Sequence, residues 1–488
     1  MKNLVILTIA LFGVCSFINT NLSTTNTEIT ICRAVSVETN AVAFAPELGP
    51  NRALAVLVRR NAYGLTPAQI DVYRKAVAKM KQWSVANPND RIGWTYQAAI
   101  HGSTTMPAQP LWNQCKHGSL EFLAWHRVYL YFFERILRKA AAEAGVAGAA
   151  TFTLPYWNYT DVVAQRSIPP GFRTPANATN SLFTASRAAG INTGSSLPAP
   201  VVSTSTAMSK TVYTGGLGFN RQLELQPHNV VHGTIGGLMG LTTTAGLDPI
   251  FWLHHCNIDR LWESWLRQGG GRVNPTTNTV WMNTSYTFYN ENRQPVNMTI
   301  RQILNIQTML NYRYDDMPVV IAAPTEVIAA APPQDKPRTK LLTKTNFDVN
   351  ERDNRTGVIA AINTNEVVTK LTGSAGRYIL SLSDIKVTEI PDGAYEVYVC
   401  LPNSIKDPTY KSSHFVGMFS TFGLEERRGH QNHTQAPVEF DITKQIKNLK
   451  SKRIDVSKFS VTLKLTGVSP NVKKGKVKIN NISLYTED

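Results

Sequence analysis

The sequence Asp248-Pro-Ile-Phe-Trp-Leu-His-His-Cys-Asn-Ile-Asp-Arg260 joins the start of a helix to a pair of histidines. Asp is a favoured cap and Pro a favoured first residue of a helix, so Asp248 and Pro249 predict that a helix begins here. Neighbouring side chains on a helix point roughly 100° apart. We therefore expect only one of His254 and His255 to point into a site that this helix lines.

Further histidines precede this stretch at short spacings, namely His101, His117, His126, His228 and His232. His228 and His232 are four residues apart, which places both rings on one face of a helix. His126 follows the apolar stripe of a helix predicted over residues 119–142. His117 would face the opposite side of a continuous helix, so we place it on the preceding loop. His101 ends the segment over residues 94–100 and is the natural third member of the set that contains His117 and His126.

Imidazole is the usual protein ligand of copper and also suits zinc and iron. Two sets of three histidines without an adjacent carboxylate indicate a paired metal site that performs oxygen chemistry. A hydrolytic or structural zinc protein is the competing hypothesis, and the lack of a carboxylate or a His-Glu-x-x-His motif disfavours it. Cys115 lies two residues before His117. Its thiol could be a metal ligand, a free thiol or a covalent partner of the ring, and the spacing does not choose among these.

The predicted elements change in kind along the 488 residues. Residues 46–318 show the three- and four-residue apolar spacing of helices and predict a mainly α domain. Residues 319–339 are rich in Ala and Pro and predict a linker. Residues 340–488 contain alternating apolar and polar stretches, such as residues 395–399, and predict an all-β sandwich domain.

The N-terminus and the net charge bear on the location of the protein and its partners. Lys2 and the apolar run over residues 4–18 predict a signal peptide over residues 1–20, followed by an N-terminal extension over residues 21–45, and hence a secreted or periplasmic protein. The formal charge is +16. A polyanion-binding surface and a solvated basic surface both fit this charge. We favour the solvated surface and expect no nucleic-acid or membrane partner, because no nucleic-acid-binding motif accompanies the charge.

Several segments together carry a family resemblance; they are residues 117–127, 154–157, 227–232 and 248–260. They resemble, in the right order, the two copper motifs of tyrosinases and related type 3 copper proteins. The resemblance covers residues 50–318, and residues 312–315 resemble the tyrosine motif that closes the family's catalytic domain. It implies that residues 46–318 form a catalytic domain with a four-helix bundle around a dicopper site.

The resemblance also implies two copper ions, each held by three histidines. The ligands of the first ion would be His101, His117 and His126. The ligands of the second ion would be His228, His232 and His255. His254 matches a position that is not a ligand in the family.

Further residues take roles from the resemblance. Cys115 resembles the cysteine that forms a thioether with a copper-ligating histidine, here His117, in fungal tyrosinases and molluscan haemocyanins. Glu224 with Asn229 resembles a pair that holds a water molecule for removing the proton of a monophenol, although Glu224 could equally be a surface carboxylate. Thr242 matches the gate position over the second copper ion, where a small side chain implies an open site.

The activity implied by the resemblance is the oxidation of phenols by O2. A tyrosinase hydroxylates monophenols and oxidises o-diphenols to o-quinones, and we take this as the leading hypothesis. A diphenol-only catechol oxidase and an o-aminophenol oxidase are the alternatives. A haemocyanin-like oxygen carrier is less favoured, because the chain is a single unit and not a row of repeated units.

The C-terminal third shows a weaker resemblance to the β domains of plant polyphenol oxidases and molluscan haemocyanins. Residues 414–417 and 440–443 are similar to haemocyanin segments. In those relatives the β domain covers the copper site and inserts a side chain. The resemblance therefore implies a latent enzyme that is activated when the residues after about 320 are removed or displaced. The sequence does not identify the inserted side chain.

Overall fold

The computed structural model describes residues 41–45, 55–317, 337–348, 356–358, 376–402, 404–424, 436–456, 459–469 and 472–487. The predicted signal peptide (1–20) lies outside these residues, as do most of the predicted N-terminal extension (21–45) and most of the predicted linker (319–339). These predictions therefore stay untested. Within the described part of the chain, no helix is both long and apolar enough to cross a membrane.

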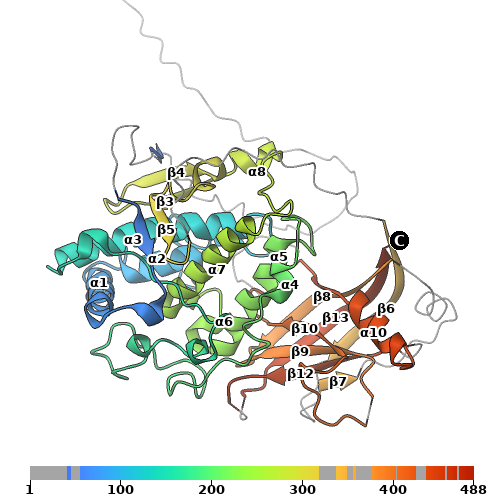
Figure 1. Cartoon of the computed structure of the whole chain (residues 1–488). Coiled ribbons are helices and arrows are strands. Elements are labelled where there is room, and N and C mark those ends of the chain that lie inside the picture. Colours follow the sequence, from blue (N-terminus) through green and yellow to red (C-terminus); the bar gives the residue numbers. More distant parts are fainter. Residues whose placement is uncertain are drawn as a thin grey trace, which may run out of the picture. The chain divides into compact units, whose positions relative to one another are not determined.

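Helices dominate residues 55–317 (Figure 1). The long helices are α1 Pro67–Ala86, α2 Trp94–His101, α3 Phe122–Glu143 and α7 Ile250–Arg267. The shorter ones are α4 Ser205–Met208, α5 Phe219–Leu223, α6 Val230–Ile235 and α8 Thr279–Asn283. A π-helical segment, η5 Glu224–Asn229, joins α5 to α6. Helix α1 packs on α2 and α3, and α3 packs on α7.

Single 3-10 turns connect these helices; they are η1 Ala62–Gly64, η2 Ala149–Thr151, η3 Val163–Arg166, η4 Pro170–Phe172, η6 Gly237–Gly240, η7 Ala245–Leu247 and η8 Ile300–Ile303. Short strands also lie in this part. A three-stranded sheet of order β1-β4-β3 contains β1 Val42–Ala43, β4 Pro295–Thr299 and β3 Ser285–Tyr289. The parallel pair β2 Leu57–Arg59 and β5 Tyr312–Tyr314 joins the beginning of this part to its end.

The helix that carries the histidine pair begins later than predicted. Asp248 has an extended backbone (φ −87°, ψ 121°), and Pro249 occupies the cap position, so α7 starts at Ile250 and not at Pro249. The Asp248 carboxylate still accepts a hydrogen bond from the Ile250 backbone N–H at 3.0 Å. It thus satisfies one of the N–H groups that a helix start leaves without a partner. The prediction was correct about the motif and wrong by one residue about the boundary.

A buried ionic cluster ties β2 and β5 to the long helices. The Arg59 side chain donates to Glu134 of α3 at 2.8 Å, and Arg127 of α3 pairs with Asp259 of α7. Tyr312 donates its hydroxyl to Asp259 at 2.7 Å. Burial raises the pKa of Asp259, but the two guanidinium groups outweigh burial and hold that pKa below its usual value. The predicted tyrosine motif therefore lies at the end of the helical part and is held to α7 by the hydrogen bond between Tyr312 and the Asp259 carboxylate.

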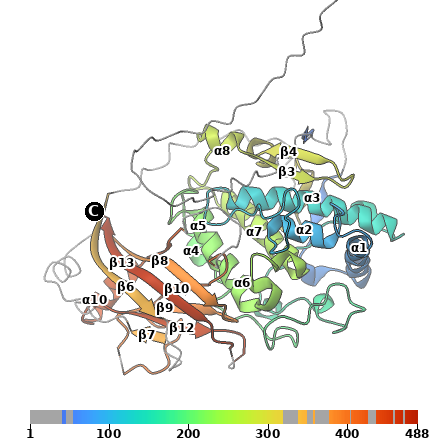
Figure 2. The same cartoon turned by 180° about the vertical axis from the view of Figure 1, so that it is seen from behind.

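The C-terminal part contains two four-stranded antiparallel sheets (Figure 2). One has the order β11-β8-β13-β6, with strands β11 Val438–Asp441, β8 Arg377–Glu389, β13 Lys476–Glu487 and β6 Arg338–Asp348. The other has the order β10-β9-β12-β7, with strands β10 Phe415–Phe419, β9 Ala394–Val399, β12 Val461–Thr466 and β7 Thr356–Val358.

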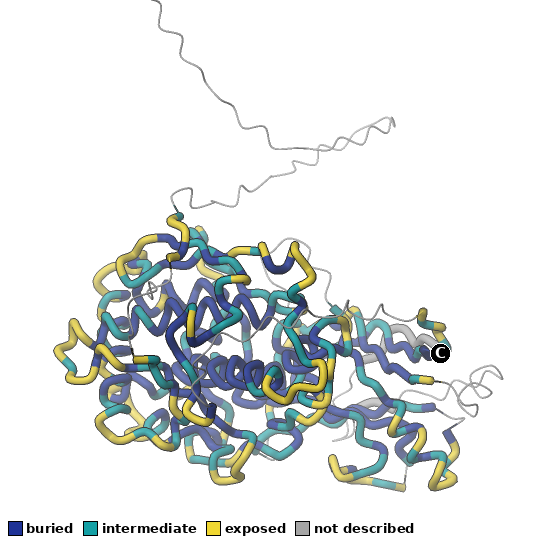
Figure 3. The backbone as a smooth tube through the Cα atoms, turned by 45° about the horizontal axis from the view of Figure 1, so that its top comes forward, coloured by how far each residue is buried: buried dark blue, intermediate teal, exposed yellow. Residues whose placement is uncertain are grey.

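One apolar core receives side chains from both sheets, including Leu380, Leu382, Val397 and Leu463. The predicted helical part and β C-terminal part are thus confirmed, whereas the four-helix-bundle geometry and the domain boundaries stay predictions. The C-terminal part is not all-β, because helix α10 Thr443–Ser451 packs Ile446 and Leu449 into this core. Figure 3 shows that buried backbone is concentrated in the helices of the first part, while exposed backbone lies mainly on connecting loops.

Candidate metal centre

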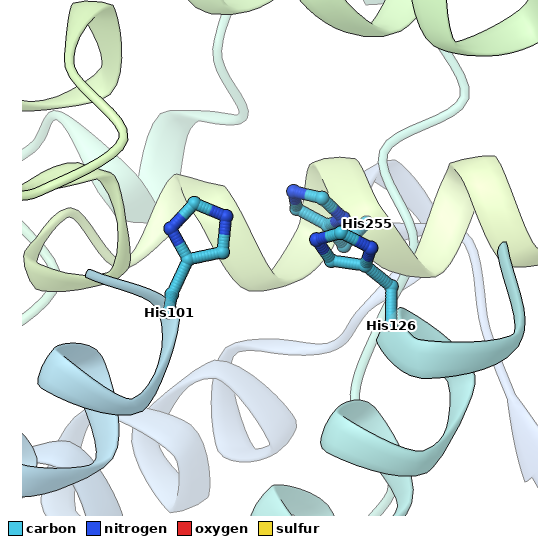
Figure 4. Close-up of side chains that lie close together, drawn as sticks. All are labelled: His101, His126 and His255. Atoms are coloured by element: carbon cyan, nitrogen blue, oxygen red, sulfur yellow. The ribbon is translucent and has the colours of Figure 1, made fainter. Parts of the chain in front are cut away.

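Six histidine rings from different elements lie together in the interior. His101 is the last residue of α2, His126 lies in the first turns of α3, and His255 lies on α7, and Figure 4 shows these three side chains pointing toward one another. The other three are His117 on the loop before α3, His228 in η5 and His232 in α6. All are buried except His117, which is partly buried. The loop position of His117 and the helical positions of His126, His228, His232 and His255 confirm the predicted local structure.

The rings of the first predicted set are mutual neighbours. Their centroids are 5.2 Å apart for His101 and His117, 5.7 Å for His101 and His126, and 5.3 Å for His117 and His126. The Nδ1 atom of His101 lies 2.8 Å from the Thr242 carbonyl oxygen. The Nδ1 atom of His126 lies 2.7 Å from the Phe122 carbonyl oxygen. An N–H at Nδ1 leaves the Nε2 lone pair available to a metal ion.

The second predicted set converges more tightly. The Nε2 atoms of His228 and His232 each lie 3.3 Å from Nε2 of His255. The Nδ1 atom of His228 lies 2.7 Å from the Asn229 side-chain oxygen, and that of His232 lies 2.9 Å from the Met239 carbonyl oxygen. In each set, two histidines therefore have a protein oxygen atom beside Nδ1, which leaves Nε2 as the nitrogen that faces the other rings of the cluster.

The two sets touch each other. The rings of His126 and His255 are stacked at 4.4 Å, and those of His117 and His228 are 5.5 Å apart. One of the three groups of possible ligand atoms among the described residues consequently mixes the predicted sets. In this group, His255 joins His101 and His126. The structure thus forms one continuous histidine cluster that can hold a pair of ions.

His254 lies closer to this cluster than the helix geometry predicted. Its ring nitrogen is within 4.8 Å of ligand atoms of both His228 and His232. The expectation that only one histidine of the adjacent pair approaches the site is therefore wrong. The segment η5, which carries His228, contacts α7, so side chains 100° apart on α7 both come near it. His254 differs from His255 in that its Nδ1 pairs with the Tyr159 hydroxyl at 3.1 Å.

Burial keeps the imidazoles of His126, His228, His232 and His255 neutral. It lowers the pKa of His126 to about 3. Burial, together with the charges of neighbouring histidines, also lowers the pKa values of His228, His232 and His255 well below the usual value. Metal ions bind the neutral form of imidazole, so the interior holds the rings in the state that a metal requires.

Cys115 lies against the ring of His117. Its sulfur is 3.5 Å from the His117 Nδ1 atom, and the side chain is buried. This separation brings the thiol to the ring edge, as a thioether to the ring needs. The bond itself stays a prediction.

Glu224 is a buried residue and not a surface carboxylate. It is 1% exposed, and its Oε1 atom accepts a hydrogen bond from the Gly118 backbone N–H at 2.6 Å. Its Oε2 atom pairs with Arg221 at 2.9 Å. Asn229 is turned towards His228 through its side-chain oxygen. Both members of the predicted pair therefore contact segments that carry histidines of the cluster.

Thr242 contacts the cluster through its backbone. The residue is 1% exposed, and its carbonyl oxygen accepts from His101 of the first set, whereas the predicted gate position lies over the second set. Its role as a gate stays a prediction.

Phe422 is a site residue that the sequence did not reveal. It belongs to the turn after β10 and stacks on the His232 ring at 3.8 Å and 9°. It also lies edge-on to His117 at 5.5 Å and to His228 at 5.7 Å, and it is fully buried. A phenylalanine in a turn almost 200 residues away carries no local signal of this position. The C-terminal part thus covers the histidine cluster with an aromatic ring.

The residues present fit two copper ions. The described clusters of possible ligand atoms contain imidazoles and one thiol, which are donors that suit copper. The Nε2 atom of His126 is buried and has no hydrogen-bond partner among the described residues. Leaving a buried polar atom unpaired is unfavourable, and a metal ion would satisfy it.

Comparison with known proteins finds similarity along most of the chain. Residues 91–206 and 185–268 match the common central domain of tyrosinase, residues 276–324 match the polyphenol oxidase middle domain, and residues 326–487 match a domain of unknown function. A tyrosinase of Hahella sp. (strain CCB-MM4) is 30% identical over 88% of this chain and 99% of its own length. The chloroplastic polyphenol oxidase A of Solanum lycopersicum is 26% identical over 88% of this chain and 72% of its own length.

Among solved structures, the fold is similar to that of a latent apple tyrosinase. The TM-score is 0.59, with 22% identity over 92% of this chain and 100% of that one. The similarity therefore extends over the helical and the β parts together.

Proposed function

Because this chain belongs to the tyrosinase family of type 3 copper proteins, we propose that it is a copper-dependent phenol oxidase that acts with O2. Its reactions would be the o-hydroxylation of monophenols and the oxidation of o-diphenols to o-quinones. The observation that carries the proposal is the cluster of six histidines, five of them buried, whose Nδ1 atoms, in four cases, are held by protein oxygen atoms. A hydrolytic zinc site would normally include a carboxylate ligand or an open water position, and the described ligand groups contain no carboxylate.

The proposed ligands of the first copper ion are His101, His117 and His126. Those of the second are His228, His232 and His255. When bound, the metal pair supplies O2 activation and electron transfer, while the protein supplies geometry and access. The oxygen partners of the Nδ1 atoms fix the planes of the His101, His126, His228 and His232 rings, and a thioether between Cys115 and His117 would fix the His117 ring covalently.

Proton removal distinguishes the two phenol reactions. A monophenol must lose its hydroxyl proton at the site, which calls for a positioned base. We assign this task to Glu224, acting through a water molecule that Asn229 helps to hold. Support comes from the burial of Glu224 and from its contact with the loop that carries His117.

A diphenol-only oxidase is the second candidate function, and one observation favours it. The Glu224 carboxylate is engaged on both oxygens, by the Gly118 N–H and by Arg221. A carboxylate with both oxygens engaged has to give up one of these hydrogen bonds before it can hold a water molecule for the substrate. In that case the same copper site would oxidise catechols or o-aminophenols without hydroxylating monophenols.

The C-terminal part would keep the enzyme latent. Phe422 occupies a position above His232, where the aromatic ring of a phenol would have to stack to approach the cluster. We assign Phe422 as the side chain that shields the site. The substrate ring would then take the place of the phenylalanine ring once the turn 420–424 moves away.

The test uses the full chain loaded with copper, as wild type and as the variants Phe422→Ala and Phe422→Leu. Turnover is measured on a monophenol and on its o-diphenol, alongside the copper and zinc content. We expect two copper ions per chain, oxidation of both substrates, and faster turnover in Phe422→Ala than in Phe422→Leu, which keeps part of the cover. Diphenol oxidation alone would select the second candidate, and O2 binding without turnover in Phe422→Ala would indicate a carrier. Retention of zinc and no copper would overturn the proposal.

A further inference from the structure

A second contact between the C-terminal part and the site runs through Arg221. Its Nη1 atom donates to the Glu224 carboxylate at 2.9 Å. Its Nη2 atom donates to the backbone carbonyl oxygens of Ala436 and Pro437, each at 3.2 Å. One guanidinium group therefore joins the proposed base to the backbone that leads directly into strand β11.

The same C-terminal segment also covers the loop that carries His117. Gly118 has φ +67°, and a Cβ added there would lie 3.4 Å from the Ala436 Cβ and 3.9 Å from the Arg221 Nη1 atom. The Gly118 N–H is the donor that holds the other oxygen of Glu224. Gly118, Arg221, Glu224 and Ala436 thus form a single contact cluster, which we call the Arg221 bridge.

The Arg221 bridge is buried and yet has room to rearrange. The Arg221 side chain is 10% exposed and the Glu224 side chain 1%. A cavity of about 290 Å³ is bordered by Gly118, Arg221, Ala436 and Pro437. If Ala436 and Pro437 move away, Nη2 loses two acceptors and the guanidinium group gains contact with water. Its attraction for the carboxylate weakens as the surrounding dielectric rises.

We propose that Arg221 is a positioning residue through which docking of the C-terminal part controls Glu224. With Ala436 and Pro437 in place, the guanidinium group engages Oε2, and a substrate proton has to compete with it for this oxygen. When the segment leaves, Oε2 is released. The C-terminal part then controls proton removal in addition to access, and monophenol hydroxylation depends on docking more strongly than diphenol oxidation does. This inference rests on the role proposed above for Glu224.

The first experiment needs neither copper nor turnover. Hydrogen exchange of the Gly118 amide is measured in the copper-free full chain for wild type, Arg221→Lys, Arg221→Gln and the remote control Arg135→Gln, which breaks the Arg135–Glu291 ion pair. Arg221→Gln removes the guanidinium group that holds the Glu224 carboxylate in place beside the Gly118 N–H. If the hydrogen bond from Gly118 to this charged acceptor is lost as a result, exchange should be roughly tenfold faster. We expect a smaller effect in Arg221→Lys, because lysine keeps the charge but cannot bind Glu224 and the carbonyl oxygens of Ala436 and Pro437 at the same time. We expect no effect in the control.

The second experiment perturbs only the C-terminal side of the Arg221 bridge. Ala436→Asp places a rival carboxylate next to Arg221, whereas Ala436→Asn has the same shape without the charge. We expect Ala436→Asp to speed Gly118 exchange more than Ala436→Asn does. In the Arg221→Gln background the two variants should no longer differ. An equal difference with and without Arg221 would overturn the proposal, as would unchanged Gly118 exchange in Arg221→Gln.

The third experiment measures the chemistry. In the copper-loaded Phe422→Ala full chain, Arg221→Gln should raise the ratio of monophenol to diphenol turnover by roughly tenfold, which is a fraction of the roughly 100- to 10,000-fold that a positioned base contributes. An unchanged or lowered ratio contradicts the link to Glu224. If no variant oxidises either substrate, the proposed function fails, while the exchange measurements still decide whether docking acts through Arg221.

Discussion

If the docked β part keeps the enzyme latent, as proposed, a single methyl group at Gly233 should shift the protein towards the active form. Gly233 follows His232 in α6, and a Cβ added there would overlap Ser420 Oγ and lie 2.9 Å from the Gly393 carbonyl oxygen. The serine hydroxyl can rotate away, but the Gly393 carbonyl belongs to the backbone at the start of β9. The β part therefore has to shift, and with it the turn that carries Phe422.

The expected size of this effect follows from the cost of overpacking. Forcing an extra methyl into a packed contact costs about 1–3 kcal/mol, which lowers the ratio of docked to undocked protein by about 5- to 150-fold. We expect a corresponding rise in the initial rate of o-diphenol oxidation by the copper-loaded full chain of Gly233→Ala.

The matched control is Gly240→Ala, because a Cβ at Gly240 meets nothing within 4 Å. Copper content and thermal unfolding are measured for both variants, so that damage to the neighbouring His232 is recognised. Removing the serine hydroxyl with Ser420→Ala should restore part of the latency of Gly233→Ala. Equal rates in Gly233→Ala and Gly240→Ala, at equal copper content, would refute the idea that docking of the β part shields the site.

Three further outcomes are expected. A peptide containing Cys115 and His117 should be lighter by two hydrogen atoms in mass spectrometry after copper loading in air, and Cys115→Ser should abolish this shift; an unchanged mass would contradict the thioether. Burial holds the folded-state pKa of His126 at about 3. The pKa of the same imidazole in the unfolded chain is about 6.5, so between these two values the unfolded chain binds more protons than the folded protein. The unfolding free energy of the copper-free protein, measured in urea, should therefore fall as the pH drops from about 6.5 towards 3. The expected slope is up to about 1.4 kcal/mol per pH unit for each such histidine. Asp259→Asn leaves two buried guanidinium groups poorly compensated and should lower the unfolding free energy by about 3–5 kcal/mol; the exposed Asp71→Asn should change it by less than about 1 kcal/mol, and similar losses for both would refute the importance of the buried cluster.

Local sequence rules predicted the parts of the site that depend on backbone geometry. The spacing of His228 and His232 gave a shared helical face, and the structure brings both within 3.3 Å of His255. The nine-residue gap before His126 placed His117 on a loop, as observed. Such predictions succeed because the α-helix has a fixed period, so residue spacing translates directly into direction.

The same rules failed where packing between distant segments decides the outcome. The period of α7 suggested that His254 turns away from the site, but contact between η5 and α7 brings its ring nitrogen within 4.8 Å of ligand atoms of His228 and His232. A helical segment inside the β part, α10, was also missed, because Ile446 and Leu449 are too few to distinguish a short helix from a turn. Both cases depend on a neighbouring element whose position the local sequence does not encode.

By itself, the sequence of this protein determined which donor atoms are available and how the segments that carry them fold. Histidine spacing, the Asp248-Pro249 helix start and the alternation after residue 340 act within a few residues, where dihedral preferences and side-chain period dominate. The tertiary structure alone decided that Phe422 stacks on His232 and that Arg221 joins Glu224 to Ala436. These contacts link residues about 190 and 215 positions apart in the chain. They form because two apolar cores pack against each other, and this packing is the sum of many weak contacts. A short stretch of sequence does not determine such a sum.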